Sequence, residues 1–333
     1  MIILTPDDVK QRFGQLFSKK FLVMVDEKTG LAEILEQCQA RGTIEWDAMN
    51  RSRAGGAMIA CNVEGKMMTM RARLGSHAIN FGAASETIGG QALEAVEVKD
   101  DEVMTTWVGI AGAGVGIAAC LPQAPGVIRS EYPSEDDLKI GGARTNHVRI
   151  ITPRYEKVCF GIDDTDTKQE GATWVTALKC TEACSIEGVK FLGMRLVQLN
   201  PAVSHKTTNC VSSALNFATR PGSIGPLCEF IRSFIEEHTS SDDTGIAVVR
   251  GIGTVEDSPL HKTVKTEIVA LDCAEHEARR LGVKFLDRNG RKGRIGALGA
   301  VLWGNRGIEA AGLYGEHLRT LYHRVSSDRG GDR

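Results

Sequence analysis

The chain has 333 residues, of which 42% are apolar and 25% are charged, a composition that is typical of folded globular domains and excludes a disordered chain. Its 40 basic and 42 acidic residues give a net charge of −2, so no overall attraction to nucleic acid or membrane is expected. No apolar run approaches the ~20 residues that cross a bilayer. We therefore expect a cytoplasmic protein with no membrane contact and full hydrophobic cores.

The nine cysteines indicate a reducing compartment, because their number is odd, no pair has CxxC spacing and the chain starts without a signal peptide. Cys180 and Cys184 stand four residues apart on an expected helix and could share a metal ion. A zinc site needs four ligands, however, so buried packing thiols are the favoured interpretation.

Residues 1–155 are predicted to form an α+β domain, whose role the sequence does not identify. Thr5-Pro6-Asp7-Asp8 is typical of a helix start, with proline in the first turn and acids at the positive end of the helix dipole. Residues 21–25 read as a buried strand and residues 31–38 as a helix. Residues 57–73 are predicted to form two strands joined by a turn.

A glycine-rich run, WVGIAGAGVGIAAC, occupies residues 107–120. Its spacing does not fit G-x-G-x-x-G and no P-loop Lys-Ser/Thr follows it, so a nucleotide-binding loop and close packing of small residues both stay open. Arg129, Arg144 and His147 could line a ligand cleft or lie on the solvated surface.

From residue 156 to 252 the pattern becomes regular and predicts the order β-α-β-β-α-β, with elements at residues 157–162, 172–185, 191–199, 210–218, 224–238 and 245–250. The helix at 224–238 has its apolar residues on one face, and Ser223 can cap it. This order favours a split βαβ, ferredoxin-like layer of helices on a sheet. Its strand-end loops would lie side by side, so residues 163–166 would face the loops that follow Asn200 and Gly251.

Three carboxylates, Asp163, Asp164 and Asp166, follow the first strand of this pattern within the segment GIDDTD. Their mutual repulsion costs free energy unless a cation or a hydrogen-bond network compensates it. Mg²⁺ prefers such hard oxygen ligands and completes its shell with phosphates and water. A metal-nucleotide site and an Asx-rich turn are both consistent with the spacing.

Residues 157–250 resemble the archaeal tRNA(Ile) 2-agmatinylcytidine synthetase family. The resemblance lies in GIDDTD, in the threonine seven residues after its last Asp, in RLVQLNPAVSHKT and in SDDTGIAVV. In that family GIDDTD opens an ATP-dependent kinase-like domain, and a threonine shortly after it becomes phosphorylated. The resemblance implies ATP and Mg²⁺ as cofactors, Asp163 and Asp164 as metal ligands, and Thr173 as the phosphorylated residue. The alternative for Thr173 is a helix-capping hydroxyl.

The resemblance also implies that Asp166 lies beside the metal and the polyphosphate. The nucleotide-site residues that it implies are Thr165, Arg195, Asn200 and Lys206. A departure follows Lys206, where the family has a glycine-rich run and this chain reads Thr207-Thr208-Asn209-Cys210. Cys210 could be a nucleophile if a neighbouring cation lowers its pKa, or an inert thiol at a strand start.

Residues 253–333 are predicted to contain a helical stripe from 268 to 281 that ends at Gly282, then a short strand. A basic, glycine-punctuated loop with Arg288, Arg291, Lys292 and Arg294 leads into a small-residue helix. This loop could bind an anion such as the nucleotide phosphates, or be solvated. It resembles the part of the synthetase that follows the kinase-like domain, a ferredoxin-like domain associated with agmatine. Acids that could bind such a cation are Glu277, Asp287 and Glu309.

The whole arrangement resembles methanogenesis marker protein 11, an archaeal family, because a 155-residue extension precedes the kinase-like region and no counterpart of the synthetase's oligonucleotide-binding fold or zinc ribbon follows. This resemblance implies ATP- and Mg²⁺-dependent phosphoryl transfer to an unknown small-molecule, protein or RNA acceptor in methanogen metabolism. One alternative is a non-catalytic nucleotide-binding assembly or regulatory protein of the methanogenesis machinery. Another is a tRNA-modifying enzyme. A homo-oligomer is compatible with each.

Overall fold

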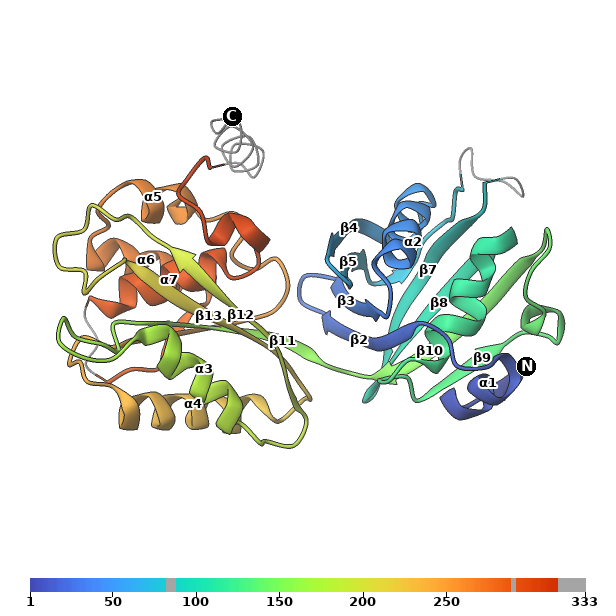
Figure 1. Ribbon diagram of the computed structural model, residues 1–333, viewed down its shortest axis with the longest axis horizontal. Helices are drawn as coiled ribbons and strands as arrows, with labels where there is room; N and C mark the ends of the chain where they lie inside the picture. Colours follow the sequence, from blue (N-terminus) through green and yellow to red (C-terminus); the bar gives the residue numbers. More distant parts are fainter. Residues whose placement is uncertain (82–87, 289–291, 317–333) are drawn as a thin grey trace, which may run out of the picture. The chain divides into compact units, whose positions relative to one another are not determined.

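The computed structural model describes residues 1–81, 88–288 and 292–316, and the chain divides into two compact units, Met1–Glu156 and Lys157–Arg333 (Figure 1). Helices and antiparallel strand pairs occur in both units, so the predicted α+β class is confirmed. In the described ranges no helix is long and apolar enough to cross a membrane.

The first unit contains two sheets and the helices α1 and α2, which span Pro6–Phe13 and Arg41–Arg53. A six-stranded sheet has the order β1-β9-β10-β8-β7-β6, formed by Ile2–Leu4, Arg129–Tyr132, Thr145–Pro153, Glu102–Ile110, Gly90–Lys99 and Gly75–Ser76. A four-stranded sheet has the order β2-β3-β5-β4, formed by Ser18–Asp26, Leu31–Cys38, Met67–Arg73 and Met58–Glu64. The predicted strands at 21–25 and 57–73 are thus confirmed.

The predicted start of α1 is also confirmed. Thr5 accepts a hydrogen bond from the backbone of Asp8, and the Asp8 carboxylate accepts one from the backbone of Thr5. This capping box satisfies two N–H groups that a helix start leaves unpaired.

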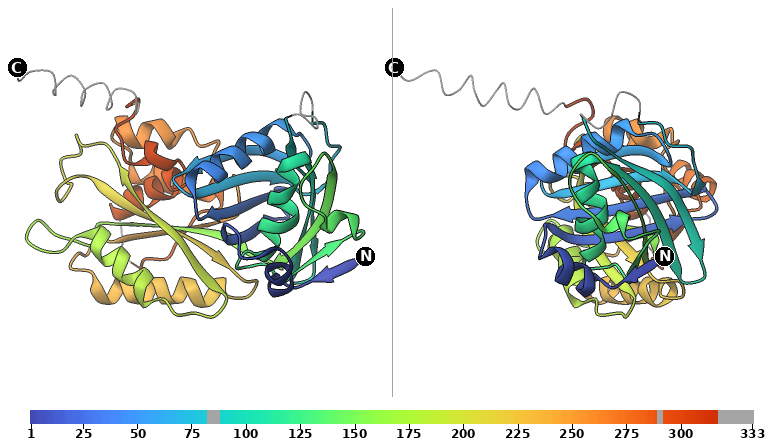
Figure 2. Two further views of the ribbon diagram at one scale, coloured as in Figure 1. Left: turned by 45° about the vertical axis from the view of Figure 1, so that its right-hand side comes forward. Right: turned by 90° about the vertical axis from the view of Figure 1, so that its right-hand side faces the viewer.

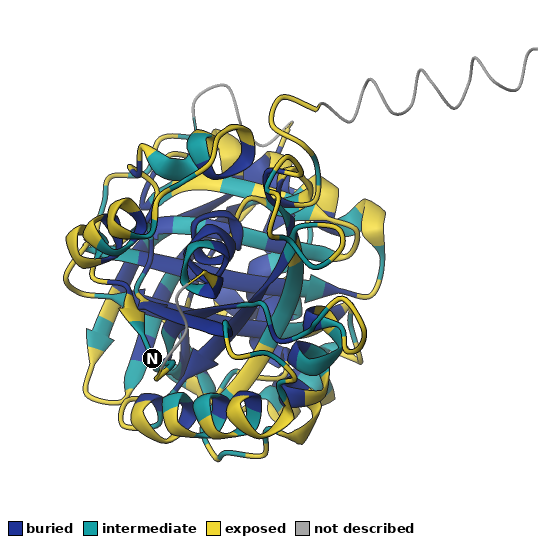
Figure 3. Ribbon diagram, turned by 90° about the vertical axis from the view of Figure 1, so that its left-hand side faces the viewer, coloured by how far each residue is buried: buried dark blue, intermediate teal, exposed yellow. Residues whose placement is uncertain are grey.

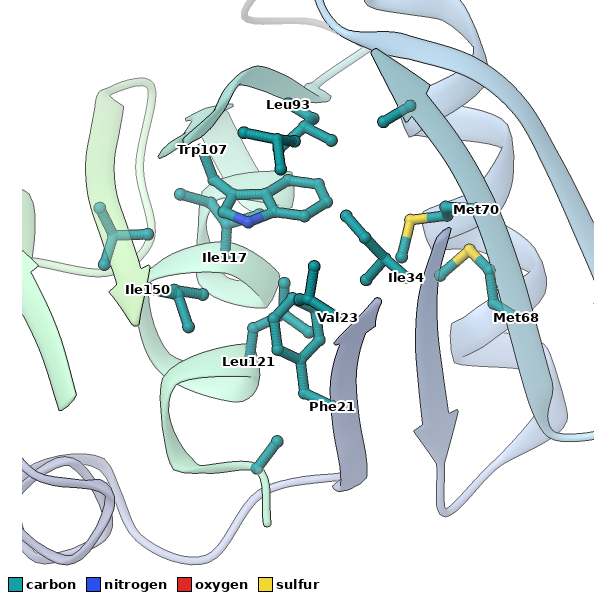
Figure 4. Close-up of a cluster of buried hydrophobic side chains, with 14 of the residues drawn as sticks. Phe21, Val23, Ile34, Met68, Met70, Leu93, Trp107, Ile117, Leu121 and Ile150 are labelled. Carbon is teal, nitrogen blue, oxygen red and sulfur yellow. The ribbon is translucent and has the colours of Figure 1, made fainter. Parts of the chain in front are cut away.

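The core of the first unit lies around Trp107 and Phe21, whose rings meet edge to face with centroids 6.4 Å apart (Figure 4). Ile34 and Met70 of the four-stranded sheet and Leu93 of the six-stranded sheet surround the Trp107 indole, as Figure 4 shows. The two sheets therefore share one apolar core.

The segment 31–38 is strand β3, so its prediction as a helix was wrong. β3 pairs with β2 on one side and β5 on the other, and residues 32–36 are buried without interruption. A strand that is covered on both faces loses the polar–apolar alternation that identifies strands, and Glu33 and Glu36 then give a false helical period.

The glycine-rich run begins in β8 and continues as short 3₁₀ and π turns at 111–113 and 116–120. A Cβ at Gly109 would lie 2.6 Å from the Gly114 Cα, and a Cβ at Gly116 would lie 2.4 Å from the Gln91 amide nitrogen. These contacts support the close-packing alternative. Arg129 pairs with Glu102 at 2.8 Å, and His147 lies 3.3 Å from Asp137.

The second unit is built on a five-stranded sheet with the order β12-β13-β11-β14-β15, formed by Val189–Gln198, Val211–Thr219, Glu156–Asp163, Gly245–Arg250 and Lys284–Phe285. With α3 at Thr173–Ala183 and α4 at Ile224–His238, residues 156–250 have the predicted β-α-β-β-α-β order. If β11 to β14 are numbered 1 to 4 in chain order, their order in the sheet is 2-3-1-4, which is that of a split βαβ fold. The hydroxyl of Ser223 donates to the Glu187 carbonyl at 3.1 Å. It does not cap α4, so the predicted cap was wrong.

Helices cover both faces of this sheet. α3 and α4 lie on one face, while α6, Leu271–Leu281, and α7, Gly293–Trp303, lie on the other (Figures 1 and 2). A separate apolar cluster fills each layer, and Figure 3 shows the buried sheet between helices whose outer faces are exposed. The expected C-terminal region, which also contains α5 at Leu260–Thr266 and β15, thus adds to the sheet of the preceding region.

Cys180 is buried against the α3–α4 layer, and burial raises the pKa of its thiol to about 12. Among the described residues, no group of three His, Cys, Asp or Glu side chains is arranged to hold a metal. The packing interpretation of Cys180 therefore fits the structure.

A buried ion pair in the first unit gives a stability prediction. Arg51 is fully buried, donates to Glu36 and, at 2.8 Å, to Gln91, and lies over the Trp107 ring at 4.9 Å. Burial raises the pKa of Glu36 while Arg51 opposes that rise. We expect Arg51→Met to lower the free energy of unfolding by about 3–5 kcal/mol, because it leaves a buried carboxylate without its cation.

The measurement is urea unfolding at neutral pH. The double variant Glu36→Gln/Arg51→Met should recover part of the loss, and Arg53→Met, at an exposed position of the same helix, should change stability by less than about 0.5 kcal/mol. A loss for Arg51→Met no larger than that for Arg53→Met would contradict the role given to this pair.

Candidate functional site

A pocket of the second unit lies where β11 ends and is lined by three parts of the chain that are distant in sequence. The first is the acidic loop, residues 163–174. The second is residues 199–211, called here the polar loop, which joins β12 to β13. The third comprises residues 264–269 and the first turn of α7. Residues 199–211 lie beside the acidic loop as predicted, and α7 forms an additional wall. The prediction for the loop after Gly251 was wrong, because β14 runs antiparallel to β11 and Gly251 bonds to Lys157 at the opposite end of β11.

Negative charge is concentrated at the base of this pocket. Burial and the neighbouring Asp164 carboxylate raise the pKa of Asp163 well above its ordinary value. Burial, followed by Asp166 and Asp243, raises the pKa of Asp164 to about 6, while Lys292 opposes this rise. The protein's own cations thus leave part of the repulsion uncompensated.

The backbone at Asp164 is held in an unusual conformation. Its φ of +52° lies in the left-handed region, which costs a residue with a side chain about 1–2 kcal/mol. The Thr244 hydroxyl donates to the Asp164 carbonyl at 2.9 Å, and Thr239 donates to the next carbonyl, that of Thr165, at 3.2 Å. These hydroxyls hold the acidic loop so that consecutive carboxylates lie at the pocket.

Thr173 is the first residue of α3 and is buried, yet it lines the pocket. Its hydroxyl donates to Asp166 Oδ1 at 3.1 Å and accepts from the Thr165 backbone N–H at 3.1 Å and the Thr165 hydroxyl at 3.3 Å. It therefore joins the acidic loop to the helix, and Ala172 occupies the cap position. The capping alternative for Thr173 does not describe these contacts.

α7 approaches the acidic strand end very closely. A Cβ at Gly296 would lie 1.6 Å from Asp163 Oδ2, so position 296 has no room for a side chain. Lys292 precedes this helix, lines the pocket and lies 3.6 Å from Asp243. The positive end of the α7 dipole and the Lys292 ammonium thus face the same carboxylates.

Asn200 and Lys206 of the polar loop line the pocket, and both also serve the loop's own structure. The Asn200 side chain accepts from the Ala202 N–H at 3.0 Å, and the Lys206 ammonium donates to the Pro201 carbonyl. The loop is therefore pre-formed around these side chains.

Three residues of the predicted nucleotide site are not among the described residues that line the pocket. Thr165 is buried behind Thr173. Arg195 lies on β12, opposite Ala214 of β13. Arg294 pairs with Asp287 and Glu275, each at 2.8 Å, because its side chain points to α6 and the β15 segment. Arg291 lies outside the described residues.

The acids proposed for a cationic ligand are engaged elsewhere. Glu277 accepts from Arg280 at 2.7 Å and from Ser258 at 2.6 Å, and Asp287 pairs with Arg294. Glu309 offers its backbone carbonyl to Lys265 at 3.2 Å. In the described ranges, none of these three lines the pocket.

Cys210 lines the pocket with a φ of +55°, a second left-handed residue beside the acidic loop. Burial and the Asp163 and Asp164 carboxylates raise the pKa of its thiol to about 11, and Lys206 only partly opposes them. The nucleophile interpretation required a lowered pKa, so the inert-thiol alternative fits the structure.

Sequence reasoning missed several pocket residues, among them Trp174, His205, Thr207 and Glu267. Thr207 donates to Asp166 Oδ1 at 3.3 Å across 41 residues of sequence. The departure from the family pattern at residues 207–210 was the available sequence signal. Only the folded structure shows which atoms that segment contacts.

The donor set of the pocket fits Mg²⁺. Asp163 and Asp164 present adjacent carboxylates whose pKa values are raised first by burial and then by neighbouring carboxylates. Mg²⁺ commonly takes one or two protein carboxylates and fills its remaining positions with phosphate oxygens and water. The pair can therefore hold this metal together with a polyphosphate, although it would not form an all-protein metal site.

Comparison with known proteins gives two kinds of match. Over 285 residues the chain is 34% identical to the uncharacterized protein MJ0921 of Methanocaldococcus jannaschii, and the match covers 85% of this chain and 92% of that protein. Residues 159–229 match the family described as the TiaS TCKD domain.

Over 150 residues the chain is 29% identical to the tRNA(Ile2) 2-agmatinylcytidine synthetase TiaS of Pyrobaculum neutrophilum, which covers 43% of this chain and 35% of the synthetase. The crystal structure of a TiaS–tRNA(Ile2)–ATP complex is 28% identical, with a TM-score of 0.39, and covers 44% of this chain and 36% of that one. A TiaS–tRNA(Ile2)–AMPCPP–agmatine complex is 27% identical, with a TM-score of 0.37 and the same coverage. The match thus spans about a third of each synthetase chain.

The raised pKa of Asp164 gives a prediction for the metal-free protein. Its pKa is about 6 in the folded chain, above its ordinary value of 3.8, so the charged form destabilises the fold increasingly as pH rises from about 4 to above 6. We expect Asp164→Asn to raise the free energy of unfolding at pH 7.5 by up to about 3 kcal/mol, because asparagine tolerates the left-handed backbone without charge.

Urea unfolding in EDTA at pH 4 and pH 7.5 measures this effect, which should be small at pH 4. Asp242→Asn, at an exposed position of a neighbouring loop, is the matched control and should change stability by less than about 0.5 kcal/mol. Equal effects of the two substitutions at pH 7.5 would argue against electrostatic strain at Asp164.

Proposed function

The chain belongs to the family of the Methanocaldococcus jannaschii protein MJ0921, and we propose that its second unit transfers the γ-phosphoryl group of ATP at the acidic strand end. The observation that carries this proposal is the pair of pocket carboxylates, Asp163 and Asp164, beside a threonine hydroxyl that donates to Asp166. The match of residues 159–229 to the TiaS TCKD domain supports ATP as the nucleotide.

Phosphoryl transfer needs groups that bind the phosphate oxygens, a positioned acceptor and a base for the acceptor's proton. Lys206 and Lys292 are cations at the pocket wall, and Asn200 adds a polar side chain. The Thr173 hydroxyl already donates to the Asp166 carboxylate, which makes Asp166 the base in this proposal. The first turn of α3 would stabilise the resulting phosphate.

A bound Mg²⁺ would neutralise the charge that develops on the phosphate oxygens. Asp163 and Asp164 are its proposed protein ligands, and Gly296 leaves the space that the Asp163 carboxylate requires. Thr244 fixes the backbone that presents Asp164 to the pocket. The proposal thus accounts for the left-handed backbone conformation of Asp164 and for the glycine at position 296.

The acceptor class best supported by the relatives is RNA. The matched synthetase is named for tRNA(Ile2), and residues 159–229 match its TCKD domain. A net charge of −2 does not exclude RNA, because phosphate contacts depend on local rather than overall charge. A small-molecule or protein acceptor in methanogen metabolism remains the alternative proposal.

The second candidate function is nucleotide binding without turnover, in an assembly or regulatory protein of the methanogenesis machinery. One observation favours it: the Thr173 hydroxyl is buried and makes three hydrogen bonds. An acceptor oxygen must turn a lone pair toward phosphorus, so at least the 3.3 Å contact with the Thr165 hydroxyl would have to open.

The test is to measure Mg-ATP binding and ATP consumption of the full chain, alone and with tRNA(Ile2), with or without agmatine, or with a metabolite extract. We expect ADP or AMP release that RNA stimulates, and at least 10-fold weaker Mg-ATP binding for Asp164→Asn, because a metal ligand is lost. Asp242→Asn should bind Mg-ATP as the unaltered chain does.

The outcomes separate the candidates. Intact Mg-ATP binding with no hydrolysis under any of these conditions would favour the non-catalytic protein. Stimulation by the metabolite extract but not by RNA would favour the small-molecule acceptor. Unchanged Mg-ATP affinity for Asp164→Asn would remove the acidic loop from the nucleotide site.

A further inference from the structure

One carboxylate oxygen of the pocket accepts two hydroxyl groups. Thr173 and Thr207 donate to the same Asp166 Oδ1, at 3.1 Å and 3.3 Å, from opposite walls of the pocket. Both hydroxyl oxygens are thus within a hydrogen bond of the atom that serves as the base in the proposed function. A phosphoryl group placed beside Asp166 would be near both.

The two hydroxyls differ in how free they are to react. Thr173 is 5% exposed, and both of its acceptor positions are occupied by donors from Thr165. Thr207 is only partly buried, and donation to Asp166 is the one side-chain hydrogen bond that the described contacts give it. Its lone pairs are therefore available to an electrophile, whereas those of Thr173 need a rearrangement.

The surroundings of Thr207 also suit a phosphate. Lys206 precedes it and His205 lies in the same stretch, and all three line the pocket. The polar loop is held at its base, where the Gln198 amide donates to the Leu199 and Asn209 carbonyls, each at 3.0 Å. Thr207 is thus a pre-positioned hydroxyl in the same pocket as the Lys206 side chain.

We propose that Thr207 is a second phosphoryl acceptor of this site, which shares Asp166 with Thr173. This inference rests on the proposed function in taking ATP as the phosphoryl donor and Asp166 as the base. In the step, a bond forms between Thr207 Oγ1 and the γ-phosphorus, and the bond from that phosphorus to the β-phosphate oxygen breaks. The hydroxyl proton passes to Asp166 Oδ1, and ADP leaves. Asp166 accepts one proton in each transfer, so the two threonines react alternatively.

The experiment incubates the full chain with γ-labelled ATP and Mg²⁺ and locates phosphate by mass spectrometry of tryptic peptides. Lys179 and Lys190 lie between the two threonines, so these residues fall on different peptides. Fragmentation distinguishes Thr207 from Thr208. The variants are Thr173→Val, Thr207→Val, the double variant and, as control, Ser204→Ala, at an exposed position of the polar loop that is not among the described pocket-lining residues.

We expect phosphate on Thr207 in the unaltered chain and in Thr173→Val, and its loss in Thr207→Val with Mg-ATP affinity retained. Thr207→Ser should restore labelling at position 207, and Ser204→Ala should label as the unaltered chain does. Asp166→Asn should slow labelling of both threonines by about 100-fold, the lower range for loss of a general base.

Label on Thr173 in the unaltered chain, with none on Thr207 either there or in Thr173→Val, would overturn this inference and leave the proposed function standing. Label on Thr207 alone would support the inference and remove Thr173 from the transfer. Bound ATP without label on either threonine, and without hydrolysis when acceptors are added, would overturn the proposed function and this inference together. Thermal unfolding and Mg-ATP binding of each variant identify any loss that comes from misfolding.

Discussion

The repulsion among carboxylates at the end of β11 is the constraint on which the pocket depends. Asp163 and Asp164 are partly or fully buried with raised pKa values, and the chain accepts a left-handed backbone at Asp164 to present them side by side. The Thr244 hydroxyl and the absence of a side chain at Gly296 serve this arrangement. Such electrostatic and backbone strain is stable only where the surrounding fold determines the geometry.

The two units bury charge in different ways. In the first unit, Glu36 has Arg51 as a direct cationic partner, and Gln91 and the Trp107 ring complete the contacts of that guanidinium. In the second unit, the nearest cation to the carboxylate pair, Lys292, is shared with Asp243. A paired buried charge specifies a fold, whereas a pair of carboxylates that the protein leaves under-compensated is suited to an external cation.

The pocket also depends on the way in which the C-terminal elements join the preceding sheet. α7 packs on the face of the sheet opposite α3 and α4, and its first turn closes the acidic strand end. The split βαβ arrangement of residues 156–250 supplies two loops, and residues 264–269 with α7 supply the remaining wall. The site therefore belongs to the whole second unit.

The sequence by itself determined the α+β class, the β-α-β-β-α-β order and the chemistry of GIDDTD, because periodicity and residue type are local properties. It failed at β3, where burial on both faces removed the alternation of a strand. Arg195 and Arg294, which were expected at the nucleotide site, are not among the described residues that line the pocket. Only the tertiary structure decided that Asp166 receives Thr207 from 41 residues away, that Gly296 lies against Asp163, and that the Cys210 thiol is held neutral. Distances between remote segments and the burial of charge are products of packing, and no spacing along the chain encodes them.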